Sequence, residues 1–249
     1  MGATTRERYA VVSCHVERPL DDAAWARFGS LQESRPGGFA IAALMRPADP
    51  VHGEDEATWL ERAKAGSERG PIGHHTHWTA PDHARPTGDS TGPRVLEEGR
   101  RLRELGLELT LFCGGGWHTD EQVAEACAEL GYVDCSPRAR RPPYLGEGEA
   151  WASLDAPALI ELSSGRELCS IPTTHSLGDL ARALPRRMLP EVVHVYFHDT
   201  DLLDGRRRAL LHGVLRLLAR RAHVTDLDTL AAELFPGAPR VAWEDVARP

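Results

Sequence analysis

The chain has 249 residues, of which 41% are hydrophobic and 27% are charged, a composition typical of soluble globular proteins. This length is sufficient for one barrel-sized core, so we expect a single domain over residues 1–249. The formal net charge of −8 argues against binding to nucleic acid or to an anionic membrane surface.

Residues 1–12 contain no apolar stretch of the length found in secretion signals. No apolar run approaches the roughly 18 residues that a membrane-spanning helix needs. Five cysteines without a CxxC pair argue against a disulfide framework and against a cysteine-rich zinc site. We therefore expect a cytoplasmic protein that acts on a small molecule.

Strand and helix patterns alternate along the chain. Apolar runs rich in β-branched residues predict strands at 9–16, 37–45, 70–78, 107–116, 132–136, 158–162, 166–174 and 191–203. Amphipathic stretches predict helices at 19–33, 55–68, 92–106, 119–131, 176–188, 206–221 and 226–235. A loop rich in proline, glycine and arginine is expected at 137–150.

Several helix ends have characteristic capping residues. Asp21 or Asp22 can begin the first helix, and Asp204 can begin the helix after the last long strand. Thr119 and Gln122 predict a capping box, and Gly131 predicts the end of the same helix.

This alternation is typical of an α/β protein with a parallel sheet, either doubly wound or closed as a barrel. A dinucleotide-binding fold requires glycines after the first strand, and "SCHVERPLDD" contains none. A distorted (β/α) barrel is therefore the expected fold. In such a barrel the active site lies at the carboxyl ends of the strands.

Polar residues occur at those predicted ends. His15 and Glu17 end the first strand, His75 and His77 end the third, and His198 ends the last long strand. Alternate residues of a strand share a face, so His75 and His77 can point into the barrel while His74 points away. A His-x-His pair with a third histidine or a carboxylate is the ligand set of a catalytic zinc site.

Several residues at the strand ends have more than one interpretation. Glu17 can be a ligand, a general base or the partner of Arg18 at the surface. Trp78, Trp117 and Asp199 can contact substrate, although ordinary packing and turn formation explain them equally well. The glycines of "CGGG" allow either close approach of a ligand or a tight turn.

The chain resembles the polysaccharide deacetylase superfamily, which includes carbohydrate esterase family four, from about residue 9 to about residue 235. The resemblance rests on the order of "IGHHTH", "LFCGGGWHTDEQVAEACAELGYVDCS", "VYFHDTDLLDGRRRALLHGVLRLLARR" and "VTDLDTLAAEL". It implies a distorted barrel, commonly seven-stranded, that removes acetyl groups with a divalent metal, often zinc.

The family's motifs are altered in this chain. His15 and Glu17 stand where the resemblance places an Asp-Asp pair, and Cys113 stands where it places an arginine. His75 matches the first histidine of the usual His-x-x-x-His pair, but Thr79 occupies the second position. His198 matches the family's late histidine, which acts as an acid.

These features favour a metal-dependent hydrolase that deacetylates an amino-sugar-like or other small amide. The metal, expected to be zinc, would be held by His75 and His77 with His15 or Glu17 as the third ligand. Glu17, if it is not a ligand, would act as base, and His198 would act as acid. Two alternatives remain: a small-molecule binder without catalysis, and a metal-free C–N hydrolase that uses His15 and Glu17.

Overall fold

The computed structural model describes residues 8–88, 90–186 and 189–248. The first seven residues of the stretch assessed for a secretion signal, and the last two residues of the helix predicted at 176–188, lie outside this description. Among the described residues, no helix combines the length and the hydropathy that crossing a membrane requires.

The strands are β1 (Tyr9–Val16), β2 (Ala42–Met45), β3 (Ile72–Thr76), β4 (Leu111–Gly114), β5 (Val133–Asp134), β6 (Trp151–Ala152), β7 (Ala158–Glu161), β8 (Glu167–Ser170), β9 (His175–Ser176), β10 (Val192–His198), β11 (His223–Val224), β12 (Arg240–Ala242) and β13 (Ala247–Arg248). The α-helices are α1 (Asp22–Ser34), α2 (Glu56–Ser67), α3 (Thr91–Glu104), α4 (Glu121–Leu130), α5 (Leu177–Arg186), α6 (Gly205–Leu218), α7 (Leu227–Leu234) and α8 (Trp243–Val246). Short 3₁₀ turns follow β4 at Gly115–Trp117 and β10 at Asp199–Leu203.

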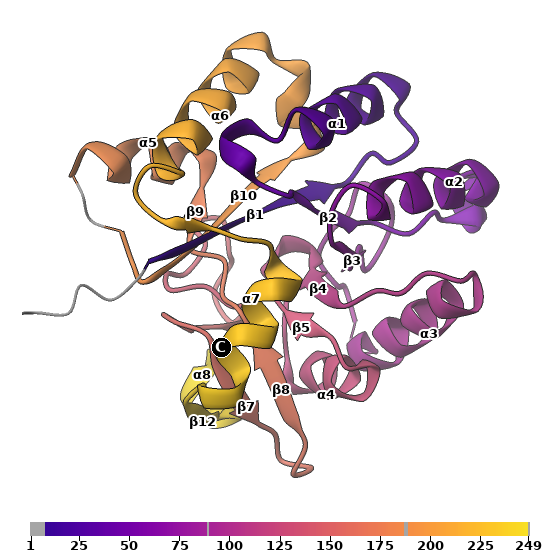
Figure 1. Ribbon diagram of the computed structural model, residues 1–249. Helices are drawn as coiled ribbons and strands as arrows, with labels where there is room; N and C mark the ends of the chain where they lie inside the picture. Colours follow the sequence, from indigo (N-terminus) through magenta and orange to yellow (C-terminus); the bar gives the residue numbers. More distant parts are fainter. Residues whose placement is uncertain (1–7, 89, 187–188, 249) are drawn as a thin grey trace, which may run out of the picture.

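Parallel strands form the centre of the molecule, in the order β8-β5-β4-β3-β2-β1-β10-β9, and helices surround them (Figure 1). This confirms the predicted α/β class. In the pairing of β1 with β10, His15 lies directly beside His198. The carboxyl ends of distant segments of the chain are thereby brought together.

The segment from β8 to β9 contacts both ends of the series that runs from β5 to β10. The amides of Ile171 and Thr173 donate to the carbonyls of Asp134 (3.0 Å) and Pro137 (2.9 Å), on the β5 side. The next amide, that of Thr174, donates to the carbonyl of His194 on β10 at 3.0 Å. Closure into a seven-stranded barrel and the single-domain organisation stay predictions.

Two apolar clusters pack against the two faces of the sheet. The outer one lies between strands and helices and includes Val12 of β1 and Phe28 of α1. The inner one includes Val11 of β1 and Leu227 and Leu230 of α7. Because Val11 lies near the amino end of β1, α7 covers the end of the sheet opposite the candidate site.

Most of the predicted helix ends are correct. The carboxylates of Asp21 and Asp204 accept hydrogen bonds from the first turns of α1 and α6, and Gly131 ends α4 in the left-handed conformation. The predicted capping box at Thr119 is wrong, since α4 is capped by Asp120, which accepts from the Val123 amide at 2.9 Å. A carboxylate one residue later takes the bond that the threonine hydroxyl would have made.

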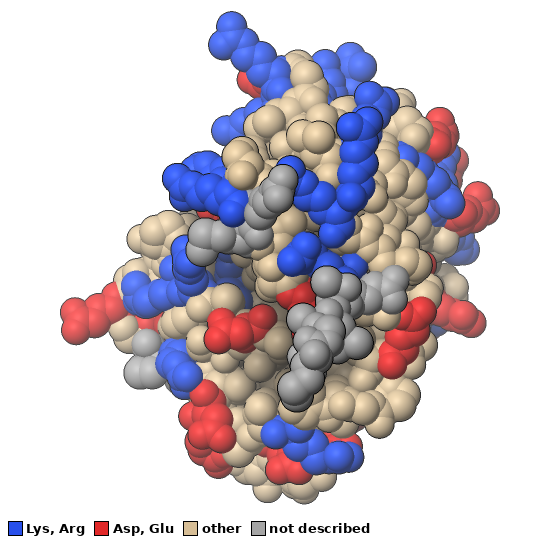
Figure 2. Space-filling view, turned by 60° about the vertical axis from the view of Figure 1, so that its left-hand side comes forward, with Lys and Arg blue, Asp and Glu red and all other residues tan. Residues whose placement is uncertain are grey.

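The charges of the surface are unevenly distributed. Figure 2 shows blue Lys and Arg side chains concentrated in the upper half of one face. The sequence of α6 alone, "GRRRALLHGVLRLL", contains four arginines and no acidic residue. The net charge of −8 therefore does not describe every face of the molecule, and the expected lack of nucleic-acid and membrane partners stays a prediction.

Candidate active site

Five predicted residues meet at the carboxyl ends of β1, β3 and β10. The ring centroid of His15 lies 4.7 Å from that of His75 and 5.4 Å from that of His198. The rings of His75 and His77 are 5.1 Å apart. Oε1 of Glu17 is 4.0 Å from Nε2 of His77 and 3.5 Å from Nε2 of His198. We call His15, Glu17, His75, His77 and His198 the histidine cluster.

The period of the strands explains this convergence. His15 lies on the inner face of β1 with Val11, four residues earlier, because alternate side chains share a face. On β3 the same rule separates His75 from His74, as predicted. Nε2 of His74 is 2.9 Å from Oε2 of Glu98 on α3, on the outer side of the sheet.

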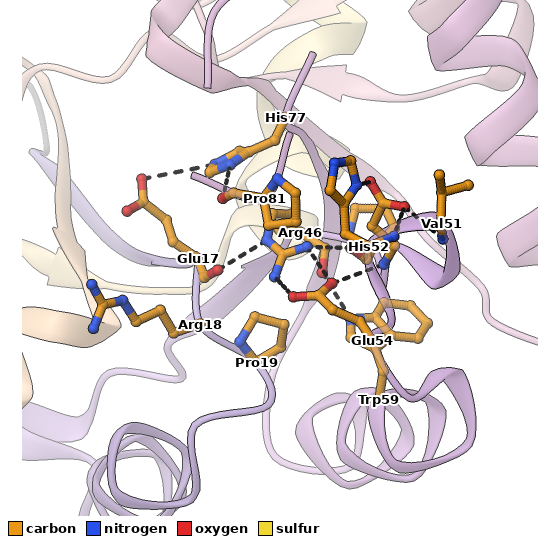
Figure 3. Close-up of polar contacts among 12 residues, drawn as sticks. Glu17, Arg18, Pro19, Arg46, Val51, His52, Glu54, Trp59, His77 and Pro81 are labelled. Atoms are coloured by element: carbon orange, nitrogen blue, oxygen red, sulfur yellow. Dashed lines mark hydrogen bonds and ion pairs between the residues drawn. The ribbon is translucent and has the colours of Figure 1, made fainter. Parts of the chain in front are cut away.

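The loop after β1 that carries Glu17 is held by two buried polar side chains. Figure 3 shows Arg46, whose Nε donates to the Glu17 carbonyl at 2.9 Å while its other nitrogens bind Glu54 at 2.7 and 2.6 Å. The carboxylate of Asp199 accepts from the Arg18 amide at 2.8 Å. The Glu17 side chain itself remains 32% exposed, so water can reach it.

Two of the imidazoles have a fixed tautomer. Nδ1 of His75 is 2.8 Å from the carbonyl oxygen of Cys113, and Nδ1 of His77 is 2.8 Å from that of Pro81. A carbonyl oxygen only accepts, so each Nδ1 carries the proton and each Nε2 keeps a free lone pair. Such support of the far ring nitrogen is characteristic of metal-binding histidines.

The free nitrogens are buried. Nε2 of His15, His75 and His77 has no hydrogen-bond partner among residues 8–88, 90–186 and 189–248. A buried, unpaired imidazole nitrogen is costly unless it binds something. Such nitrogen atoms are the ligand type that zinc hydrolases use, although His15 and His77 belong to different sets of neighbouring donors, and not to the single set of three histidines that the sequence predicts.

Burial also keeps these rings neutral. Burial lowers the pKa of His15 and His75 well below the ordinary range, because the charged form loses its hydration. Repulsion from neighbouring histidines is a smaller cause in the same direction. Burial lowers the pKa of His77 to about 4. All three rings are unprotonated near pH 7, the form that a metal requires.

Two sets of three donors share His75. Donor atoms of Glu17, His75 and His77 lie within 4.8 Å of one another, and so do those of His15, His75 and Cys113. The sequence interpretation did not include Cys113 among the ligands. Its position beside His75 follows from the register of β3 and β4, which periodicity within one strand does not reveal.

Two aromatic residues complete the wall beside His15. The ring of Trp117 lies 5.0 Å from that of His15, and the ring of Tyr196 lies 5.3 Å from it. Trp117 was predicted as a substrate contact, whereas Tyr196 was missed. The sequence pattern that could have placed Tyr196 beside His15 is its position two residues before His198, on the same face of β10.

Two predicted contacts lie outside the histidine cluster. Trp78 is 6% exposed, donates to the Gly115 carbonyl at 3.3 Å and packs against His118. Asp199 is 1% exposed, and its carboxylate accepts from the amides of Arg18 and Thr200. Both side chains are therefore engaged in packing and loop formation, and their contact with a substrate stays a prediction.

We expect the stability of the protein to fall as the pH decreases from 6.5 towards 4. Buried His194, 2.9 Å from the Ser13 hydroxyl, has its pKa lowered by burial from 6.5 to about 4, as His77 has. Between these values the unfolded chain binds more protons, so the free energy of unfolding decreases with falling pH, by roughly 3 kcal/mol for each ring. Urea unfolding between pH 7 and pH 4 measures this.

A variant separates this effect from general acid unfolding. His194→Gln removes one of the buried rings whose pKa is lowered and should give a shallower decrease. His83→Gln is the matched control, because His83 is 68% exposed and its replacement should leave the slope unchanged. A wild-type stability that stays constant across this range would contradict the prediction.

Comparisons with known proteins find similarity in the fold and none in the sequence. No family model and no curated protein matches the chain. The 4-alpha-glucanotransferase of Thermococcus litoralis aligns with 94% of the chain at 12% identity and a TM-score of 0.56, and the chain spans 40% of that protein. A BA3943 mutant, a CE4 family pseudoenzyme with restored enzymatic activity, aligns with 94% of the chain at 10% identity and a TM-score of 0.50, over 68% of its own length.

A putative polysaccharide deacetylase involved in O-antigen biosynthesis from Bordetella bronchiseptica has a TM-score of 0.48 at 14% identity, covering 91% of this chain and 90% of that one. At identities of 10–12%, the similarities to the glucanotransferase and to the CE4 family pseudoenzyme show the fold alone. The resemblance to the polysaccharide deacetylases is thus supported at the level of the fold.

Proposed function

We propose that the chain is a metal-dependent hydrolase that removes an acyl group, such as acetyl, from the nitrogen of a small amide. The observation that carries this proposal is the set of buried, unpartnered Nε2 atoms on His15, His75 and His77, next to the carboxylate of Glu17. Amino-sugar-like amides are the proposed substrate class, by analogy with the CE4 family to which a protein of similar fold belongs.

His75 would hold the metal together with His77 and Glu17, or together with His15 and Cys113, and zinc suits donors of these kinds. Bound there, the ion would supply Lewis acidity to the acyl carbonyl group. The neutral state of the three imidazoles leaves them free to bind it.

Glu17 and His198 are placed for the proton transfers. The carboxylate of Glu17 is exposed enough to meet water and to accept its proton. Nε2 of His198 lies 3.5 Å from that carboxylate, and the ring can deliver a proton to the departing amine. The rings of Trp117 and Tyr196 pack beside that of His15.

The direct test is metal analysis of protein purified without chelators, followed by assays of acetate release from N-acetylated sugars and amino acids. We expect about one equivalent of metal and acetate release that chelation abolishes. Protein without stoichiometric metal, whose activity zinc, manganese, cobalt and nickel all fail to raise, would contradict the proposal. Full activity after chelation would favour the metal-free hydrolase, and binding without turnover the non-catalytic alternative.

We expect Glu17→Gln to lower kcat by roughly 10²- to 10⁴-fold, the usual contribution of a general base. Metal content distinguishes the two roles of Glu17: a variant that keeps its metal has lost a base, and one that loses it has lost a ligand. Glu33→Gln is the matched control, because Glu33 is 63% exposed on α1, where it pairs with Arg69. Wild-type turnover in Glu17→Gln would exclude Glu17 from catalysis.

A further inference from the structure

An arginine lies behind the aromatic wall of the histidine cluster. Arg138 follows β5, in the loop predicted at 137–150. Its Cζ lies 4.5 Å from the ring centroid of Trp117 and 5.1 Å from that of Tyr196. Both rings also contact His15, so a single aromatic ring separates the guanidinium from the cluster.

The two rings hold the guanidinium in a defined position. A cation over aromatic faces is attracted by their negative quadrupole, and this attraction increases when water is partly excluded. Nη1 of Arg138 also donates to the Tyr196 hydroxyl at 3.4 Å. The side chain is half-buried and held in place beside the cluster.

Arg138 has no carboxylate partner within ion-pair distance in the described part of the chain. Arg46 provides the contrast, since it is 5% exposed and forms a bidentate pair with Glu54 at 2.6 and 2.7 Å. A guanidinium kept partly from water without a counter-ion is unfavourable, and it gains most from a bound anion. Its planar array of donors matches a carboxylate or a phosphate.

Building on the proposed hydrolase function, we propose that Arg138 binds an anionic group of the substrate, a carboxylate or a phosphate. The substrate would then be an N-acyl compound that carries this anion on the side of the molecule facing Trp117 and Tyr196. Arg138 acts here as a specificity-determining residue, because it lies outside the set of groups proposed to perform the hydrolysis.

The test compares three probes that share an N-acetyl group. N-acetylglucosamine is neutral, N-acetylmuramic acid carries a carboxylate, and N-acetylglucosamine 6-phosphate carries a phosphate. Calorimetric titration of the full-length wild-type protein should show at least one anionic probe bound tenfold or more tightly than the neutral one. Which anionic probe binds more tightly identifies the anion.

Arg138→Met should remove this preference, and Arg138→Lys should retain part of it, because lysine keeps the charge but loses the bidentate geometry. Arg140→Met is the matched control, since Arg140 is an exposed arginine of the same loop. The Arg140→Met substitution should change the affinity for each of the three probes by less than twofold. Unfolding curves of each variant confirm that the fold is retained.

Equal affinity of wild type for neutral and anionic probes, or equal losses in Arg138→Met and Arg140→Met, would overturn the inference. The inference would be overturned as well if none of the three probes bound to the protein. The readout does not need turnover, so it is separable from the hydrolase proposal. An anionic probe that binds through Arg138 and is never hydrolysed would support this inference and contradict the proposed function.

Discussion

Replacement of His75 by alanine is expected to abolish metal binding and to lower hydrolysis by more than about a hundredfold. His75 is the member shared by the two possible donor sets, so its loss leaves neither with three donors. Loss of His15 or His77 removes a donor from one set only. Metal content by mass spectrometry and acetate release, measured on the same preparation, check the prediction.

His83→Ala is the control for this experiment. The His83 side chain is 68% exposed and pairs with Asp82 outside the cluster, so metal content and activity should remain those of wild type. His75→Asn provides a second, less disruptive variant if the alanine variant unfolds. Stoichiometric metal in a folded His75 variant would show that this residue is not a ligand.

Gly114→Ala should destabilise the fold by about 3 kcal/mol or more, since overpacking against rigid backbone has no easy relaxation. A Cβ atom at Gly114 would collide with the carbonyl oxygen of His118, a backbone atom that cannot rotate away. The next glycine is equally confined: a Cβ at Gly115 would lie 2.5 Å from the carbonyl oxygens of Thr76 and Ala84. Denaturant unfolding gives the change in free energy.

Gly213→Ala is the matched control. Gly213 is an exposed residue of α6, and a Cβ atom added there would meet nothing within 4 Å, so alanine should stabilise the helix by about 0.5–1 kcal/mol. A decrease in the free energy of unfolding for Gly114→Ala together with an increase for Gly213→Ala would show that the glycines of "CGGG" are required for a tight turn. Equal small effects would contradict this explanation.

The parts of the site that could be predicted are those governed by the period of a strand. The separation of His74 from His75 and His77 required only that alternate side chains face opposite ways. The grouping of His15 with His198 required the further rule that parallel strands end at one edge of the sheet.

The parts that could not be predicted depend on competition between local groups or on contacts between distant segments. Asp199 is of a residue type common in active sites and follows a strand end, but its carboxylate accepts hydrogen bonds from two backbone amides. Thr119 fits a capping motif, but Asp120 is a stronger acceptor and takes the bond. The position of the Arg138 side chain depends on the rings of Trp117 and Tyr196, which belong to two other segments of the chain. No pattern in the loop at 137–150 predicts this position.

The pairing of β1 with β10 has a consequence for the order in which the site can form during synthesis. Ser13 and His194, in contact across these strands, are separated by 181 positions, so a growing chain leaves one backbone edge of β1 unpaired until β10 leaves the ribosome. An unpaired strand edge of this kind can associate with other chains. Nascent chains of this protein should therefore depend on protection by chaperones until its last long strand has emerged.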